Sequence, residues 1–284
     1  MTPEKIKAAC AAVGLEERFS QVIQASRPSI VLHAHRISKE AELGSSRLGG
    51  LPDLGLGQEW PLWKERPLSF IAQINLRDLS HFPASRELPS DGLLSFFYDS
   101  EQSTWGFDPN DTGSFSVVFQ PEQNLRNAAR PKLLPVEAVF PACRLTFTEV
   151  LSPPAPDSYV FNAMGFSDLD RHKYFDALHH LDGDDPFRWR SHLLGHPDQI
   201  QGDMQEECAL VAAGLYCGDE KAYSDPRRPI LAREAPSWKL LLQIASEKEA
   251  GMMWGDLGCL YYWIHERDLR KQLFDRSWMI LQCG

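Results

Sequence analysis

Three short motifs occur twice in this chain, in the same order, and this repetition constrains the fold more than any other feature. Residues 46–53 read SRLGGLPD and residues 191–198 read SHLLGHPD, so the serine, a leucine, one glycine, the proline and the aspartate are in register. The other two matches pair residues 70–74 (FIAQI) with 240–244 (LLLQI), and residues 92–97 with 258–263. The sequence therefore predicts two related halves.

The repeated residues indicate structure more than chemistry, because they are turn-forming and core-forming residues with one glutamine. Gln73 and Gln243 each lie inside an apolar run, where the amide would be buried. A buried amide without hydrogen-bond partners costs about 1–3 kcal/mol. We expect each amide to hold a loop such as residues 50–52 against the sheet, or else to face a cleft between the halves. On superposition, Gln73 should lie over Gln243, and Gly92 over Gly258.

The pattern of apolar residues predicts an α+β fold with mainly antiparallel sheets and few helices, because strands and helices do not alternate regularly. Strands are expected at residues 28–37, 68–74, 93–98, 114–120, 143–150, 238–244, 258–264 and 278–283. Helices are expected after Thr2, which can cap a helix that begins at Pro3, and at residues 168–178, 203–215 and 266–273.

A proline-rich segment lies near the middle of the chain. Residues 152–157 read SPPAPD, and such a run favours an extended, semi-rigid linker. It separates an N-terminal half with leading helices, residues 1–151, from a C-terminal half, residues 158–284. We expect the two halves to pack as one unit.

Net charge, hydropathy and cysteine spacing indicate which partners and which cellular location to expect. The net charge of −10 opposes nonspecific binding to nucleic acid, because phosphate contacts supply most of that affinity, and it suits a basic partner. No apolar run approaches the ~18 residues of a membrane span, so no membrane partner is expected. The six cysteines are scattered without a Cys-x-x-Cys pair. We therefore expect reduced thiols, no disulfide and a cytoplasmic location.

Signatures of catalysis and of metal binding are weak. There is no Gly-x-Ser-x-Gly elbow and no Walker loop. His33 and His35 would share one strand face and could begin a zinc site, but a half-exposed strand face is favoured. His179 and His180 precede acidic residues at 182, 184 and 185, where an exposed acidic turn is favoured over a cation site. No metal and no cofactor are expected.

The motifs in both halves resemble the YwqG-like family of uncharacterised bacterial proteins. The resemblance rests on residues 46–52, 60–61, 67–76, 88–97, 192–203, 238–244 and 254–262. The family often has lysine before its Gly-Gly pair, and this chain has Arg47. The resemblance implies a largely β, α+β fold of two related halves and no established activity. Some relatives are suspected near toxin loci, which implies an interaction or immunity role.

We therefore expect a cytosolic, non-enzymatic binding protein for an unknown protein or small molecule. Arg47 precedes two glycines, and we expect it to contact a ligand or partner more than to form a core ion pair. The alternative for Arg47 is a surface ion pair with a neighbouring acid such as Asp53 or Glu59. The alternative is a hydrolase or metal-dependent enzyme that uses His192, His196 and Asp203. The candidate cleft between the halves comprises Arg47, Gly49, Gly50, Trp60, Gln73, His196, Gln201, Asp203, Gln243, Trp254 and Asp256.

Overall fold

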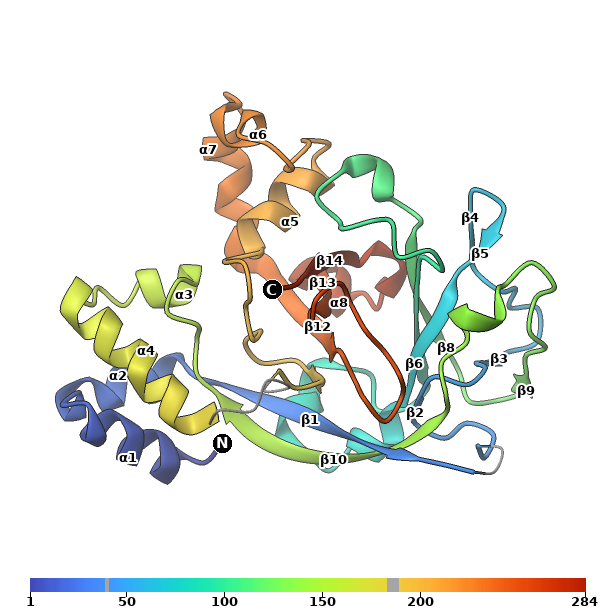
Figure 1. The fold of residues 1–284 in the computed structure, drawn as a ribbon, viewed down its shortest axis with the longest axis horizontal. Coiled ribbons are helices and arrows are strands. Elements are labelled where there is room, and N and C mark those ends of the chain that lie inside the picture. The colour runs from blue at the N-terminus through green and yellow to red at the C-terminus, as the bar shows by residue number, and fades with distance from the viewer. Residues whose placement is uncertain (39–40, 183–188) are drawn as a thin grey trace.

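A computed structural model describes residues 1–38, 41–182 and 189–284 of the chain. Its centre is a ten-stranded sheet in which every neighbouring pair is antiparallel (Figure 1). The sheet comprises β1 (Arg27–Arg36), β2 (Arg47–Leu48), β6 (Ser69–Asn75), β7 (Leu93–Tyr98), β8 (Phe115–Gln120), β10 (Cys143–Ser152), β11 (His192–Leu193), β12 (Trp238–Ala245), β13 (Cys259–His265) and β14 (Trp278–Gln282). Two small ladders pair β3 (Asp53–Leu54) with β9 (Arg126–Asn127), and β4 (Leu62–Trp63) with β5 (Arg66–Pro67). The α+β class with mainly antiparallel sheet is confirmed.

The two longest strands, β1 and β10, form the middle of the sheet. The order is β14-β13-β12-β11-β1-β10-β2-β6-β7-β8. The strands β2, β6, β7 and β8 therefore lie beyond β10, whereas β11 to β14 lie beyond β1. The two groups form opposite wings of one sheet. We call β2, β6, β7 and β8 the N-terminal wing, and β11 to β14 the C-terminal wing.

The wings pack against each other across a shared core. The ring of Phe96 on β7 lies 5.1 Å from that of Tyr262 on β13, and the hydroxyl of Tyr262 donates a 3.1 Å hydrogen bond to the carbonyl of Phe97. At the outer strands, Phe115 of β8 meets Trp278 of β14 at 5.1 Å. These edge-to-face contacts add to the burial of the rings, so the curled sheet encloses most of the core.

A helical unit lies at one end of the sheet and has a core of its own. It comprises α1 (Pro3–Ala12), α2 (Phe19–Ala25), α3 (Tyr159–Asn162) and α4 (Asp168–Asp182). The Thr2 side chain caps α1, as predicted, by accepting a hydrogen bond from Lys5 N–H. Ile6 and Val22 pack with Phe161 and Tyr174 in this core. The helices before and after the proline-rich segment therefore belong to one cluster.

The proline-rich segment is itself packed. Ser152 is the last residue of β10, Pro153 and Pro154 are buried, and the Tyr174 hydroxyl donates a 2.8 Å hydrogen bond to the Pro154 carbonyl. The segment thus connects the sheet to the helical unit through specific contacts.

The remaining helices are short. They are α5 (Gln205–Ala212), α6 (Lys221–Ser224), α7 (Arg228–Leu231) and α8 (Glu266–Arg270), with 3₁₀ helices η1 (Glu16–Arg18), η2 (Leu76–Leu79), η3 (Pro83–Glu87), η4 (Pro109–Asp111), η5 (Val136–Ala138), η6 (Ala232–Ser237) and η7 (Phe274–Arg276). The helices predicted at 203–215 and 266–273 are therefore shorter than expected. No helix within the described ranges has both the length and the apolar character needed to cross a bilayer.

Candidate functional site

Gln73 is fully buried and fastens the loop that follows β2 to the sheet. Its Oε1 accepts a 2.9 Å hydrogen bond from the Asp53 N–H. Its Nε2 donates to the Ser45 carbonyl at 2.9 Å and to Asp53 Oδ2 at 3.0 Å. Of the two roles predicted for this amide, the structure has the one in which it holds a loop.

Arg47 lies beside Gln73 and forms a core ion pair. Its Nη1 lies 2.8 Å from Asp53 Oδ2, and its Nε and Nη2 donate to the Leu51 carbonyl. The side chain is 2% exposed. The expectation that Arg47 contacts a ligand rather than forming a core ion pair is wrong, because the loop turns back and brings Asp53 under the guanidinium. Burial raises the pKa of Asp53, but hydrogen bonds from Arg47 and Gln73 lower it overall.

Gln243 makes a matching set of bonds in the other wing. Its Oε1 accepts a 2.8 Å hydrogen bond from the Asp198 N–H, and its Nε2 donates to the Arg190 carbonyl at 2.8 Å and to Asp198 Oδ2 at 3.1 Å. His192 lies opposite Gln243 on the neighbouring strand, as Arg47 lies opposite Gln73. Both wings therefore combine an amide, a carboxylate and a basic side chain.

His192 differs from Arg47 in its charge and its contacts. Its Nε2 is 4.0 Å from Asp198 Oδ2, and its Nδ1 lies 2.9 Å from both Ser29 Oγ and the Leu194 carbonyl. Burial lowers the pKa of the imidazole, although the charge of Asp198 opposes this. His192 is therefore a neutral, hydrogen-bonded core residue at neutral pH.

His196 and Asp203 bond to different segments from those that hold His192. His196 is buried, its Nε2 lies 2.8 Å from the Ala25 carbonyl, and burial lowers its pKa to about 4. Asp203 accepts hydrogen bonds from the Tyr159 N–H at 2.6 Å and the Gln205 N–H at 2.9 Å. Burial raises the pKa of Asp203. The Asp203 carboxylate thus links the first turns of α3 and α5. A negative charge at the N-terminus of a helix stabilises the helix through its dipole.

The remaining predicted site residues are spread over the fold. Gly49 has φ +59°, and a Cβ there would lie 2.4 Å from the Pro141 carbonyl oxygen, so glycine is required for packing. Gly50 also has a positive φ, and its N–H donates to the Phe140 carbonyl. Gln201 is exposed, and its N–H donates to Gln282 Oε1.

The two predicted aromatic residues pack inside the molecule. Trp60 donates from Nε1 to the Leu68 carbonyl at 2.9 Å and lies against Phe97. Trp254 is fully buried, with its ring 5.5 Å from that of Phe140. Of the predicted cleft residues, Asp256 lines the cavity described next.

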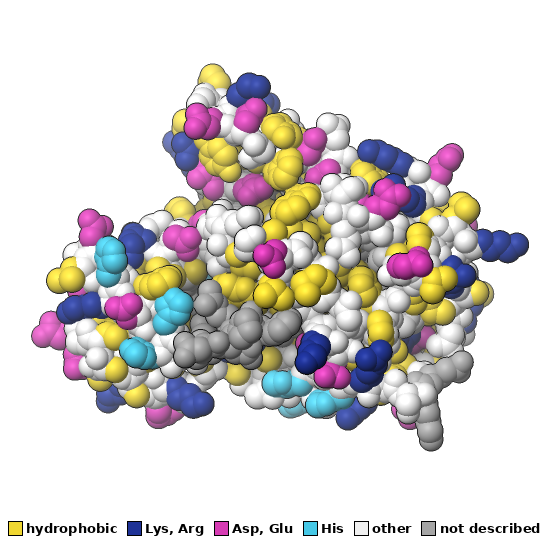
Figure 2. Space-filling view, viewed as in Figure 1, with side chains coloured by type: hydrophobic (Ala, Val, Ile, Leu, Met, Phe, Trp, Pro, Cys, Tyr) yellow, Lys and Arg dark blue, Asp and Glu magenta, His cyan; other side chains and the backbone are white. Residues whose placement is uncertain are grey.

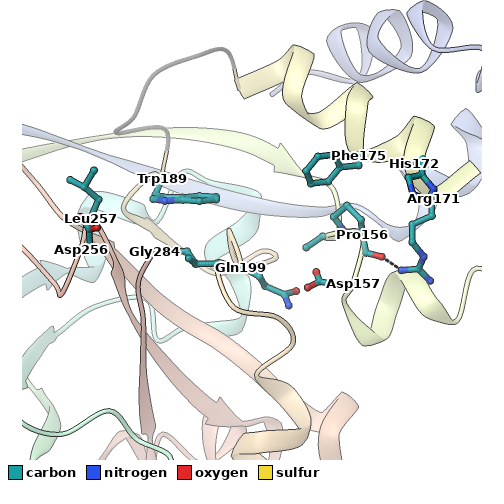
Figure 3. Close-up of a pocket in the computed structure, with 12 residues that line it drawn as sticks. Pro156, Asp157, Arg171, His172, Phe175, Trp189, Gln199, Asp256, Leu257 and Gly284 are labelled. Carbon is teal, nitrogen blue, oxygen red and sulfur yellow. Dashed lines mark hydrogen bonds between the residues drawn. The ribbon is translucent and has the colours of Figure 1, made fainter. Parts of the chain in front are cut away.

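A cavity of about 780 Å³ lies between the helical unit and the C-terminal wing (Figure 3). Figure 2 shows hydrophobic side chains gathered across the middle of this face, between α1–α4 and the wing. Trp189 lies between the Asp256–Leu257 turn and α4, where Phe175 faces the cavity. The lining comprises Ala155, Pro156, Asp157, Arg171, His172, Phe175, Trp189, Gln199, Ile200, Asp256, Leu257 and Gly284.

The charged side chains that line this cavity differ in the partners they have. Arg171 donates to the Pro156 carbonyl and, at 2.8 Å, to Asn162 Oδ1. Asp157 and Asp256 form no ion pair within the described part of the chain. The cavity therefore combines an apolar surface with two carboxylates that form no ion pair with a described residue and one guanidinium, that of Arg171, which bonds to neutral oxygens.

One polar atom in the lining also lacks a partner. Nε2 of Gln199 is buried and makes no hydrogen bond with any described residue. Figure 3 shows the Gln199 amide and the Asp157 carboxylate directed towards each other across the cavity. A ligand with a hydrogen-bond acceptor would satisfy this donor.

Sequence reasoning missed Asp157, Arg171, Phe175, Trp189 and Gln199. One signal was available for Phe175, because it follows Tyr174 directly on α4. Neighbouring positions on a helix point in different directions, so Phe175 cannot share the buried face of Tyr174. Its side chain is indeed 52% exposed.

The other chemical candidates have structural roles or lie outside the described residues. His33 and His35 are exposed on β1 and bond to Thr148 and Thr146 of β10. All six cysteines are free and buried. Among the described residues, no three His, Cys, Asp or Glu side chains are grouped to hold a metal ion. The acidic turn predicted at 182–185 extends into residues 183–185, which lie outside the described ranges.

Comparison with known proteins gives a family without an assigned function. A search of the curated proteins finds no match. One family model matches residues 46–283, which include Gln73 and Gln243 with their aspartate partners, and nine of the ten strands of the large sheet, all but β1. The chain therefore belongs to the family described as Domain of unknown function (DUF1963).

Proposed function

We propose that the protein is a non-enzymatic binding protein that holds a partially apolar, cationic ligand in the cavity beside α4. A lysine- or arginine-containing segment of a partner protein has this chemistry. The observation that carries the proposal is the pairing of Trp189 and Phe175 with the carboxylates of Asp157 and Asp256 in one cavity. Aromatic surfaces and unpaired acids together favour such a segment.

Size and overall charge support this ligand class. The cavity volume of about 780 Å³ lies within the range of ordinary ligand sites, about 300–1,000 Å³. The net charge of −10 favours the approach of a basic partner. The Gln199 donor adds a place for a backbone carbonyl of the partner.

The cavity lining contains no serine, threonine, cysteine or lysine among the described residues, and the groups of nucleophilic type there are Asp157, Asp256 and His172. We assign the two carboxylates to ligand binding. The alternative, a hydrolase or metal-dependent enzyme that uses His192, His196 and Asp203, stays a prediction. Assays of hydrolase activity on the His196→Gln variant would address it.

A further part of the proposal is that residues 46–98 and 191–264 are two copies of one ancestral unit. The matched bonds of Gln73 and Gln243 support this, as does the position of a bulge two residues before each glutamine. A cytoplasmic location, a YwqG-like bacterial origin and an immunity-type role belong to the same proposal.

The binding proposal is tested by fluorescence anisotropy with a fluorescein-labelled pentapeptide of alternating lysine and leucine. An equivalent glutamate–leucine peptide is the comparison. We expect the basic peptide to bind more tightly, and the double variant Asp157→Asn/Asp256→Asn to weaken it at least tenfold. Phe175→Ala should also weaken binding.

Asp91→Asn is the matched control, because Asp91 is an exposed acid on the distant turn before β7. Its affinity for the basic peptide should equal that of the unmodified protein. Equal binding of the two peptides, or full binding by the double variant, would overturn the proposal.

A further inference from the structure

A second cavity, of about 340 Å³, shares no lining residue with the first and is rich in positive charge. It lies where the start of β1, the helix η3 and the start of β12 meet. Each of these elements contributes a cation: Arg27, Arg86 and Lys239 respectively. Pro28, Pro83, Ala84, Glu87, Leu194, Gly195 and Leu240 complete the lining.

The three cations have no carboxylate partner in the structure. None of them forms an ion pair with a described residue. Glu87 is the acid in the lining, and its charge acts on both Arg27 and Lys239 without forming an ion pair. The lining therefore carries an excess of two positive charges in a chain whose net charge is −10.

The acidic residues near Lys239 do not neutralise the excess positive charge of the cavity. Glu266 and Arg270 also act on Lys239, but they form an ion pair with each other at 3.3 Å. Arg27 and Lys239 are both half-buried. Burial lowers the pKa of each, and the charge of Arg27 lowers that of Lys239 further. The two cations thus destabilise each other in the absence of an anion.

We propose that this cavity, formed by Arg27, Arg86 and Lys239, is a binding site for a phosphate group. A phosphate monoester is a dianion near neutral pH and matches the excess of two positive charges. Arginine supplies paired donors to phosphate oxygens, and lysine supplies a point charge. The volume leaves room for a small organic group or a second phosphate beside the first.

The site is tested by titration calorimetry with three probes: inorganic phosphate, pyrophosphate and glycerol 3-phosphate. Sodium chloride at matched ionic strength is the reference. We expect at least one probe to bind with one-to-one stoichiometry. Tighter binding of pyrophosphate would indicate a free polyphosphate, and tighter binding of glycerol 3-phosphate would indicate a phosphorylated small molecule. The absence of binding by all three would overturn the proposal.

Variants with opposite expected effects assign the binding to this cavity. Lys239→Met should weaken binding about tenfold, because a charge-assisted hydrogen bond is lost. Glu87→Gln should strengthen binding several-fold, because it removes the acid that competes with the ligand. Since Glu87 is exposed, this second variant should fold normally.

Lys132→Met is the matched control, because Lys132 is exposed and lies outside the cavity. Its affinity should be unchanged. The double variant Asp157→Asn/Asp256→Asn should also bind phosphate normally, which separates this site from the proposed peptide cavity. Equal effects of Lys239→Met and Lys132→Met would overturn the assignment.

Discussion

The hydrogen-bond networks around Gln73 and Gln243 share an amide and an aspartate, Asp53 in the N-terminal wing and Asp198 in the C-terminal wing. The basic residue opposite the glutamine differs between them. In the N-terminal wing, Arg47 makes a 2.8 Å ion pair with Asp53. In the C-terminal wing, the imidazole of His192 is 4.0 Å from Asp198, and burial keeps it neutral. Asp198 has its cation in Arg190 instead, whose Nη2 lies 3.6 Å from Asp198 Oδ1. The amide and the carboxylate are therefore common to both networks, and the residue that supplies the positive charge differs.

The two carboxylates also differ in exposure. The Asp53 side chain is fully buried, whereas that of Asp198 is 20% exposed. Asp53 therefore depends on the buried guanidinium of Arg47, while Asp198 is stabilised by water and by Arg190, whose side chain is 32% exposed. We expect the N-terminal network to be more sensitive to loss of Arg47 than the C-terminal network is to loss of His192.

The largest expected effect is that of Arg47→Met, which leaves the charge of Asp53 buried without its cation. The free energy of unfolding should fall by about 3–5 kcal/mol. His192→Met removes a neutral group and should cost about 1–2 kcal/mol. Urea denaturation of both variants measures the difference.

Arg47→Lys is the control for the first prediction. It retains a positive charge but loses the geometry that serves Asp53 and Leu51 together, so its cost should fall between those of the two methionine variants. Equal losses for Arg47→Met and His192→Met would show that the charge difference between the networks has no energetic consequence.

The next effect concerns the two amides, Gln73 and Gln243, which make matching hydrogen bonds. Gln73→Leu and Gln243→Leu should each lower the free energy of unfolding by about 1–3 kcal/mol, because both leave a buried backbone N–H without an acceptor. Thermal and urea denaturation would measure the losses. Gln201→Leu, at an exposed position, should change stability by less than about 0.5 kcal/mol. An unchanged stability for either buried variant would contradict the role of its amide.

The smallest effect is the dependence of stability on pH that His196 contributes. The pKa of His196 is lowered to about 4 in the folded state, from an ordinary value of 6.5. At this group the unfolded chain therefore binds more protons below pH 6.5, and the contribution of His196 to stability falls as the pH falls from 6.5 towards 4. Between pH 7 and pH 5.5 the loss from His196 should be about 1 kcal/mol. Glu207, whose pKa is raised to about 7 by burial, acts in the opposite direction over the same range.

The variant His196→Gln should lack this contribution, so its stability relative to that of the unmodified protein should rise as the pH falls from 7 to 5.5, while His33→Gln, at an exposed position, should follow the unmodified protein. Asp53 affects stability at a lower pH than His196 does. Because its pKa is lowered in the folded state, its contribution to the free energy of unfolding is lost only as the pH falls below the ordinary range of a carboxyl. A pH slope that is unchanged in His196→Gln would show that other groups cause it.

The sequence predicted the eight longer strands well, because apolar runs mark buried strands. The run at 93–98 coincides with β7, and the other seven differ by one or two residues at their ends. The two-residue strands were not predicted, and among them are β2 and β11, which carry Arg47 and His192. Helix ends were less accurate. For example, Asp203 was placed within a helix, whereas its carboxylate accepts from Gln205 at the start of α5. Such capping depends on a side-chain direction that periodicity does not contain.

The site was predicted poorly, for a physical reason. The cavity is built from single residues of segments far apart in the chain, such as Asp157, Phe175, Trp189 and Asp256. The repeated motifs are visible in the sequence because each is a short continuous segment, but their residues Arg47 and Gln73 fasten a loop and do not line the cavity. Proximity of distant segments depends on how the sheet curls, and no short motif encodes that.

The central pairing of β1 with β10 has a consequence for how the chain acquires its structure during synthesis. Arg27 and Ser152 lie 125 positions apart. The first long strand therefore leaves the ribosome well before its central partner exists, with its hydrogen-bonding edges open. Pairings between such distant segments form slowly, and open edges recruit other chains. Yield on expression should therefore depend on temperature and on the availability of chaperones that bind nascent chains.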